Sequence, residues 1–204
     1  MTLEKEEFNL STKASGRIDV LVPRCLIGEG ANILGVTVDF EGLCSLQVEW
    51  RHGKICSIKG LKDASKVPNE ILLPRFSEPH AHLDKAFSWS RAPNYKGSYQ
   101  EALVANLNDY KSRSQGQLLF SVEKSLNLAL VNGIRAIRSH IDSFGENVMR
   151  DWDLLEDVRK KWRDKIFLQF VALVPLEFWQ TYEGELLAQR VALNGDLLGG
   201  VIAP

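Results

Sequence analysis

The chain has 204 residues, of which 45% are hydrophobic and 25% are charged, and its formal net charge at pH 7 is −1. This composition is typical of a globular protein with a buried core, and the charge gives no electrostatic reason to expect binding to nucleic acid or to a membrane. The three cysteines are widely spaced and form no Cys-x-x-Cys pair, so we expect free thiols rather than a zinc knuckle. No apolar run is long enough for a signal peptide or a membrane span, which predicts a cytoplasmic protein.

The first third of the chain predicts a tail followed by a small β domain. Residues 1–16 are polar and lack periodicity, so we expect them to be disordered. Short runs rich in β-branched residues at 18–22, 33–38, 44–50 and 55–58 indicate a β-sandwich-like antiparallel unit over residues 17–73. The apolar run at 71–76 predicts one more short, buried strand.

The rest of the chain, residues 74–204, alternates between strand and helix patterns. Helices are predicted at 118–130, 152–162 and 181–193, and strands at 134–142, 165–174 and 197–202. This alternation is typical of a parallel sheet with crossover helices. A full (β/α)8 barrel takes about 250 residues. We therefore predict an α/β fold in which a partial, truncated TIM-type barrel of about four strands follows the β unit.

A histidine pair lies directly after the apolar run at 71–76. Side chains alternate along a strand, so His80 and His82 should point the same way, with Glu78 and Asp84 beside them. Two neutral imidazoles on one face can bind a metal ion. A His-x-His pair also has purely structural explanations. The position at the end of a strand, before a polar loop, favours metal binding because barrel enzymes carry their chemistry there.

A second polar constellation follows on the strand predicted at 134–142. Arg138, His140 and Asp142 share one face of that strand and could face a barrel interior near its mouth. Asp142 could hydrogen-bond to His140 or to a metal ligand and fix its orientation without touching the metal itself. The alternative is a buried pair of Arg138 and Asp142 with a hydrogen-bonded histidine, and for these residues alone that alternative is favoured.

Two further candidates come directly after the histidine pair. The carboxylate of Asp84 could hydrogen-bond a ligating imidazole, and Lys85 could hold a substrate carboxylate or oxyanion. The equally plausible alternative is an ion pair on the surface, which contributes little to stability.

These motifs resemble the amidohydrolase superfamily. The resemblance is carried by residues 73–85, which contain His-Ala-His-Leu-Asp-Lys, and by residues 137–142, which contain Arg-Ser-His-Ile-Asp. It is strongest to the branch of cytosine deaminase and the isopropylammelide hydrolases, and it runs from about residue 17 onward. The resemblance implies a small β-sandwich beside a metal-containing (β/α)8 barrel, with His80 and His82 as metal ligands and His140 and Asp142 in the pocket.

The resemblance also implies residues that this chain lacks. Family members complete the site with later histidines, an aspartate after strand eight and a glutamate that shuttles the proton. This chain ends at about strand four. In the cytosine deaminase branch a glutamine after strand three contacts the base, whereas this sequence reads Val174-Pro175-Leu176-Glu177 there, which argues against cytosine itself as the substrate.

The sequence thus supports two readings of function. In the first, the chain derives from a hydrolase of C–N bonds in cyclic amidines or amides that uses one zinc or iron ion and a nitrogen heterocycle as substrate. We expect this chain alone to be weakly active or inactive, because a catalytic metal usually takes three protein ligands and needs a general base. In the second, it is a non-catalytic fragment or interaction module. An open barrel edge would then pair with a second copy or with a complementing C-terminal half.

Overall fold

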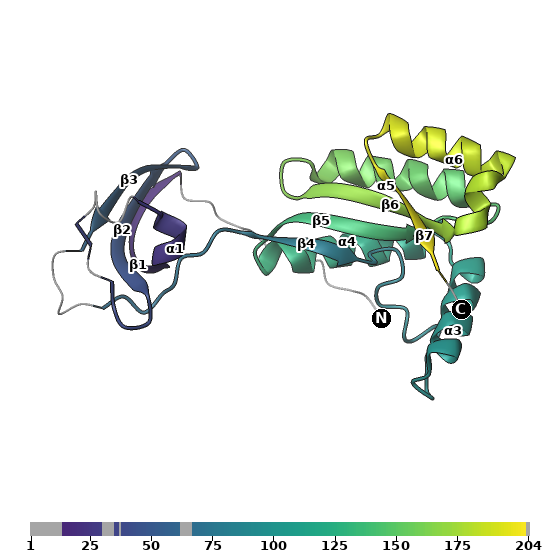
Figure 1. The fold of residues 1–204 in the computed structure, drawn as a ribbon, viewed down its shortest axis with the longest axis horizontal. Coiled ribbons are helices and arrows are strands. Elements are labelled where there is room, and N and C mark those ends of the chain that lie inside the picture. Colours follow the sequence, from purple (N-terminus) through teal and green to yellow (C-terminus); the bar gives the residue numbers. More distant parts are fainter. Residues whose placement is uncertain (1–13, 30–34, 37, 62–66, 203–204) are drawn as a thin grey trace. The chain divides into compact units, whose positions relative to one another are not determined.

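The computed structural model describes residues 14–29, 35–36, 38–61 and 67–202, and the chain separates into two compact units (Figure 1). These are the N-terminal unit, Met1–Pro74, and the barrel unit, Arg75–Pro204. The tail predicted over residues 1–16 lies outside the described residues except for its last three, of which Ser15 and Gly16 belong to the first strand. Half of the strand predicted over 33–38, namely residues 33, 34 and 37, also lies outside them.

The N-terminal unit is an antiparallel sheet of three strands, which confirms the predicted small β unit. Its strands are β1 (Ser15–Pro23), β2 (Leu43–Arg51) and β3 (Lys54–Gly60), in the order β1-β2-β3, and the short helix α1 (Arg24–Ile27) follows β1. Alternate residues of β1 and β2 face one side, as expected for a sheet with a single buried face. They form the core of the unit: Val20, Val22, Cys44, Leu46 and Val48.

The barrel unit is built on four parallel strands whose order in the sheet follows the chain. The strands are β4 (Phe76–Ala81), β5 (Ile134–Asp142), β6 (Phe167–Pro175) and β7 (Leu197–Val201), in the order β4-β5-β6-β7. The helices are α3 (Tyr99–Ser112), α4 (Gln115–Val131), α5 (Val148–Trp162) and α6 (Tyr182–Leu193), with a 3₁₀ turn η1 (Leu176–Gln180) after β6. This arrangement confirms the predicted α/β class and the partial barrel.

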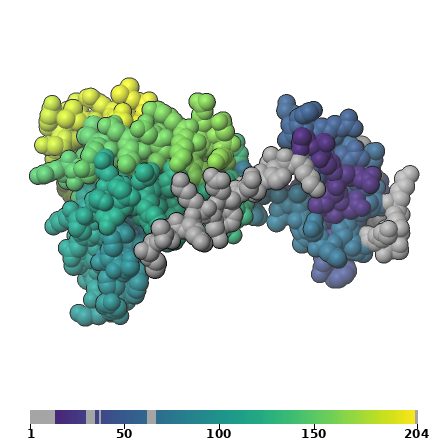
Figure 2. Space-filling view, turned by 180° about the vertical axis from the view of Figure 1, so that it is seen from behind, coloured from purple at the N-terminus to yellow at the C-terminus, as the bar shows by residue number. Residues whose placement is uncertain are grey.

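Helices α4, α5 and α6 cover one face of this sheet. Their apolar stripes meet alternate residues of β5 and β6 in a single core that includes Leu126, Trp152, Phe170 and Leu187. The colours of Figure 2 pass in order from teal through green to yellow across this unit, as expected when each segment packs beside the one before it. No helix among the described residues is long and apolar enough to cross a membrane.

Two elements differ from the sequence-based expectation. The strand predicted over 71–76 is wrong: β4 begins at Phe76, and Ile71 instead makes an isolated bridge with Leu21 of the N-terminal unit. Pro74 has no N–H to donate to a ladder, so it separates the two segments. Helix α3 was not predicted at all. Its N-cap is Ser98, whose hydroxyl accepts a hydrogen bond from the N–H of Glu101 at 3.2 Å.

Candidate functional site

Three histidines come together where β4 and β5 end. His80 lies on β4, His82 follows the strand directly, and His140 is near the end of β5. The rings of His80 and His140 stack with centroids 3.9 Å apart, and the rings of His80 and His82 are 5.2 Å apart. The carboxyl ends of parallel strands meet at one edge of a sheet, which explains why residues 58 positions apart in sequence become neighbours.

His82 has the orientation that a metal ligand needs. Its Nδ1 lies 3.0 Å from the carbonyl oxygen of His140, so the Nδ1–H tautomer donates there and leaves Nε2 as the lone-pair nitrogen. Burial lowers the pKa of His82, and the positive charge of Lys85 lowers it further. The ring is therefore kept in the neutral form that binds metals.

His80 and His140 differ in their exposure. His80 is exposed, and its backbone N–H donates to Oε1 of Glu78 at 2.9 Å. The pKa of His140 is lowered by burial and then by the neighbouring His80, and its buried Nδ1 has no hydrogen-bond partner among the described residues. Within the part of the chain that the structure describes, no group of three or more His, Cys, Asp or Glu side chains is arranged to hold a metal ion.

Asp84 is fully buried behind the histidines, so the alternative of a surface ion pair is wrong for it. The guanidinium of Arg113 donates to the Asp84 carbonyl at 2.6 Å and lies 3.8 Å from its Oδ2, while the backbone N–H of Asp142 donates to the same Oδ2 at 3.2 Å. Burial, followed by the charge of Asp142, raises the pKa of Asp84 to about 6. Asp84 ties the loop after β4 to the end of β5, and the ring of His82 is held by a main-chain carbonyl instead.

Lys85 pairs with Asp142 rather than with its neighbour in sequence. Its Nζ is 2.8 and 2.9 Å from the two carboxylate oxygens, and Nδ2 of Asn106 donates to Oδ2 at 2.8 Å. The alternative in which Arg138 pairs with Asp142 is wrong, because Arg138 is exposed and its Nε donates to Oε1 of Gln169 at 2.8 Å.

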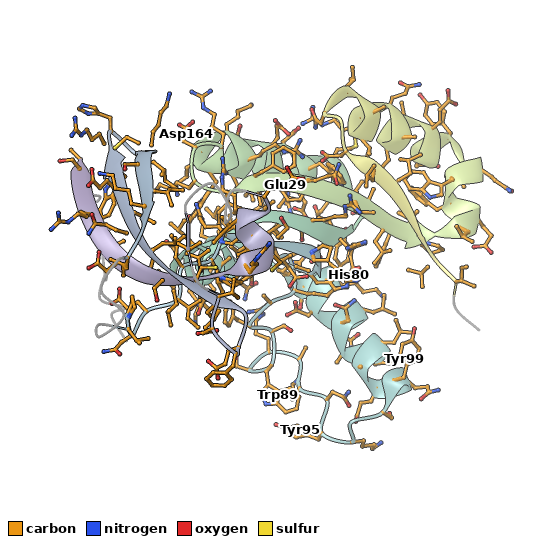
Figure 3. All side chains as sticks on the ribbon, turned by 60° about the vertical axis from the view of Figure 1, so that its left-hand side comes forward. Glu29, His80, Trp89, Tyr95, Tyr99 and Asp164 are labelled. Carbon is orange, nitrogen blue, oxygen red and sulfur yellow. The ribbon has the colours of Figure 1, made fainter. Side chains whose placement is uncertain are left out.

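A cavity of about 930 Å³ opens at this edge of the sheet. His82, Lys85, Asn106 and Asp142 give it a polar side. The other side is mostly apolar and comes from α3, the end of β6, η1 and β7. Its apolar lining includes Leu103, Leu107, Leu173, Leu176 and Ile202. Figure 3 shows Tyr99, which also lines the cavity, on the first turn of α3, and Trp89 and Tyr95 on the loop that leads into that helix.

Asn106 is the polar cavity residue that sequence reasoning missed. Its helix carries little apolar periodicity, since Asp109 is its only buried residue, so the pattern gave no reason to expect a helix there. The one available signal was the capping pair of Ser98 and Glu101, which marks a helix start.

The chain is similar in sequence to two curated enzymes, although no family model matches it. It is 35% identical over 173 residues to a pterin deaminase of Rhizobium rhizogenes, which covers 79% of this chain and 39% of the enzyme. It is 23% identical over 147 residues to an N-isopropylammelide isopropyl amidohydrolase of a Pseudomonas species, covering 69% of this chain and 36% of that enzyme. The chain therefore spans less than two fifths of the length of these relatives.

Solved structures of similar topology agree with the fold. A 5-methylcytosine deaminase from Klebsiella pneumoniae matches 89% of this chain and 42% of its own, with a TM-score of 0.65 at 19% identity. An N-isopropylammelide isopropylaminohydrolase from Burkholderia multivorans matches 89% of this chain and 44% of its own, with a TM-score of 0.55 at 25% identity. The chain belongs to the amidohydrolase superfamily and corresponds to a partial, N-terminal portion of these relatives.

Proposed function

We propose that this chain carries the first part of the active site of a metal-dependent hydrolase acting on amino-substituted nitrogen heterocycles. The observation that carries the proposal is the fixed, neutral ring of His82 beside His80 at the carboxyl ends of the strands. The names of the relatives support the reaction class, since pterin deaminase and isopropylammelide amidohydrolase both break a C–N bond at a heterocycle.

The proposed reaction adds water to a ring carbon that bears an amino group. A C–O bond forms, the exocyclic C–N bond breaks, and the amine leaves with a proton taken from the water. A bound zinc or iron ion would supply a water molecule of lowered pKa. His80 and His82 would hold that ion, and the cavity beside them would hold the ring.

The donor set is suitable for a metal but incomplete. Two neutral imidazoles suit zinc or iron, whereas a catalytic zinc site usually has three protein ligands. The described residues offer no third ligand in place. We therefore infer that further ligands and a proton shuttle come from a segment that corresponds to the rest of the relatives, joined to this chain or supplied by a partner.

The test measures metal binding and ammonia release on the same samples. We expect zinc to bind the chain with a dependence on both histidines, and His82→Ala to weaken binding at least about tenfold. His52→Ala is the matched control, because His52 lies in the turn between β2 and β3 of the N-terminal unit. Ammonia release from pterin should be low and should require metal. Equal zinc affinity of wild type and His82→Ala would contradict the proposal.

The open edge of the sheet favours a second candidate, an interaction module. β7 ends the strand order of the barrel unit, and Leu198 and Val201 on it are exposed. A strand edge with exposed apolar residues is a template for pairing with another chain. A monodisperse dimer without metal or activity, measured by light scattering, would support this candidate, whereas a monomer would contradict it.

A further inference from the structure

Lys85 and Asp142 form a pair with hydrogen-bonding capacity left over. An ammonium group has three N–H donors, and a carboxylate has about four acceptor positions. The two contacts from Lys85 and the one from Asn106 use two of these donors and three of these acceptors. Counted over the described residues, one donor on Lys85 and one acceptor on Asp142 remain unused, and the two groups that carry them are 2.8 Å apart.

Both residues line the cavity that also contains His82. The side chain of Lys85 is 22% exposed and that of Asp142 is 6% exposed, so a molecule in the cavity can touch the pair. The two charges cancel, so an anion gains little from the pair. A neutral group with an N–H next to a carbonyl complements the pair, because it offers one acceptor for Lys85 and one donor for Asp142 on adjacent atoms.

We propose that Lys85 and Asp142 bind the lactam edge of the heterocycle, that is, a ring N–H adjacent to a ring carbonyl. Lys85 donates to the carbonyl oxygen and Asp142 accepts from the ring N–H. Asn106 is a positioning residue that holds the carboxylate from α3, and Leu103 and Leu107 of the same helix offer an apolar wall for the ring. The assignment rests on the proposed function only for the heterocyclic nature of the substrate, and it adds the edge that is recognised.

The experiment compares two ligands that differ at one position. Pterin has the lactam edge, and 3-methylpterin has the same ring with the N–H replaced by N–CH₃. Equilibrium binding is measured by pterin fluorescence with EDTA present, so neither metal nor hydrolysis enters the result. We expect wild type to bind pterin at least about tenfold more tightly than 3-methylpterin, because the methylated ligand leaves the Asp142 carboxylate without its donor.

Variants of the chain test the two residues separately. Lys85→Met should weaken pterin binding about tenfold or more, and Asp142→Asn should abolish the preference for pterin over 3-methylpterin. Asn106→Ala should reduce the same preference, a ratio that a general loss of stability would not change. Lys111→Met is the matched control, because Lys111 is an exposed lysine of the same helix that does not line the cavity.

Several results would overturn the assignment. These are no binding of pterin to wild type, equal binding of the two ligands, and unchanged binding by a Lys85→Met variant with a native circular dichroism spectrum. The comparison of ligands on wild type holds even if a variant fails to fold. Binding that depends on Lys85 together with equal zinc affinity of wild type and His82→Ala would refute the proposed function alone, and zinc binding that depends on His82 without a role for Lys85 in pterin binding would refute the lactam assignment alone.

Discussion

Replacing Arg113 with methionine should destabilise the barrel unit in a pH-dependent way. The side chains of Arg113 and Asp84 are 3% and 0% exposed, so the substitution leaves a fully buried carboxylate without its nearest cation. Arg113 also donates to the Asp84 carbonyl, and that hydrogen bond is lost at every pH. Methionine keeps much of the arginine stem volume, so packing changes little.

The magnitude follows from the pKa of Asp84. Its folded-state value of about 6 lies above the usual 3.8, so the stability that its protonated form contributes is present below pH 3.8 and is lost as the pH rises through about 6. A shift of about two units corresponds to roughly 3 kcal/mol between these limits. Arg113 lowers this pKa, so its removal raises the value further and increases the cost of ionisation. We expect Arg113→Met to lower the free energy of unfolding by about 4 kcal/mol at pH 8 and by about 2 kcal/mol at pH 5.

The assay is equilibrium unfolding in urea at both pH values. Tryptophan fluorescence reports mainly on the barrel unit, which contains Trp89, Trp152, Trp162 and Trp179. The double variant Arg113→Met/Asp84→Asn should recover part of the loss at pH 8, because a neutral amide then replaces the buried carboxylate that lost its cation. Arg163→Met is the matched control, since its ion pair with Asp164 is fully on the surface. An equal loss of stability at pH 5 and pH 8, or a double variant no more stable than the single one at pH 8, would refute the reasoning.

Three further substitutions test the packing of the helices. Gly184→Ala should lower the free energy of unfolding by about 1–2 kcal/mol despite the better helix propensity of alanine, because its Cβ would lie 2.9 Å from the carbonyl carbon of Phe178. Gly116→Ala should instead be stabilising by up to about 1 kcal/mol, because its Cβ would meet only Oγ of Ser114 at an ordinary contact distance of 3.8 Å. A thermal melt in which Gly184→Ala is more stable than Gly116→Ala would contradict this prediction. Trp152→Phe should cost about 1–3 kcal/mol, since it removes a buried hydrogen bond of 3.1 Å to Ser143 and leaves a small cavity; a change in urea midpoint within error would contradict it.

The elements that bury a regular apolar face were predictable from the sequence. Leu118, Val122 and Leu126 recur at four-residue spacing, and all three are almost completely buried in α4. Helix α3 has no such face, because it borders a cavity and its one buried residue is an aspartate. The strand predicted over 71–76 failed for another reason: hydrophobicity alone does not show that Pro74 separates two segments.

Strand alternation was enough to bring the candidate site residues to one edge, but not to assign their partners. The shared face of His140 and Asp142 follows from their spacing, and both lie at the histidine edge. The partner of Lys85 is 57 residues away, and the partner of Arg138 is 31 residues away on the next strand. Such pairings depend on how far strands shift along each other, which a single sequence does not reveal. The metal-ligand role of His80 and His82 stays a prediction until zinc binding is measured.

The strand order β4-β5-β6-β7 also has a consequence for how the barrel unit forms. Each strand from β5 to β7 pairs with the one that precedes it in the chain, and helices α4, α5 and α6 each pack against the strand that follows them. The paired strands are nonetheless far apart in sequence, since Ala136 of β5 pairs with Phe167 of β6, and such non-local parallel pairing slows folding. The unit can grow by one strand and one helix at a time during synthesis, each new strand using the exposed edge of the last as its template.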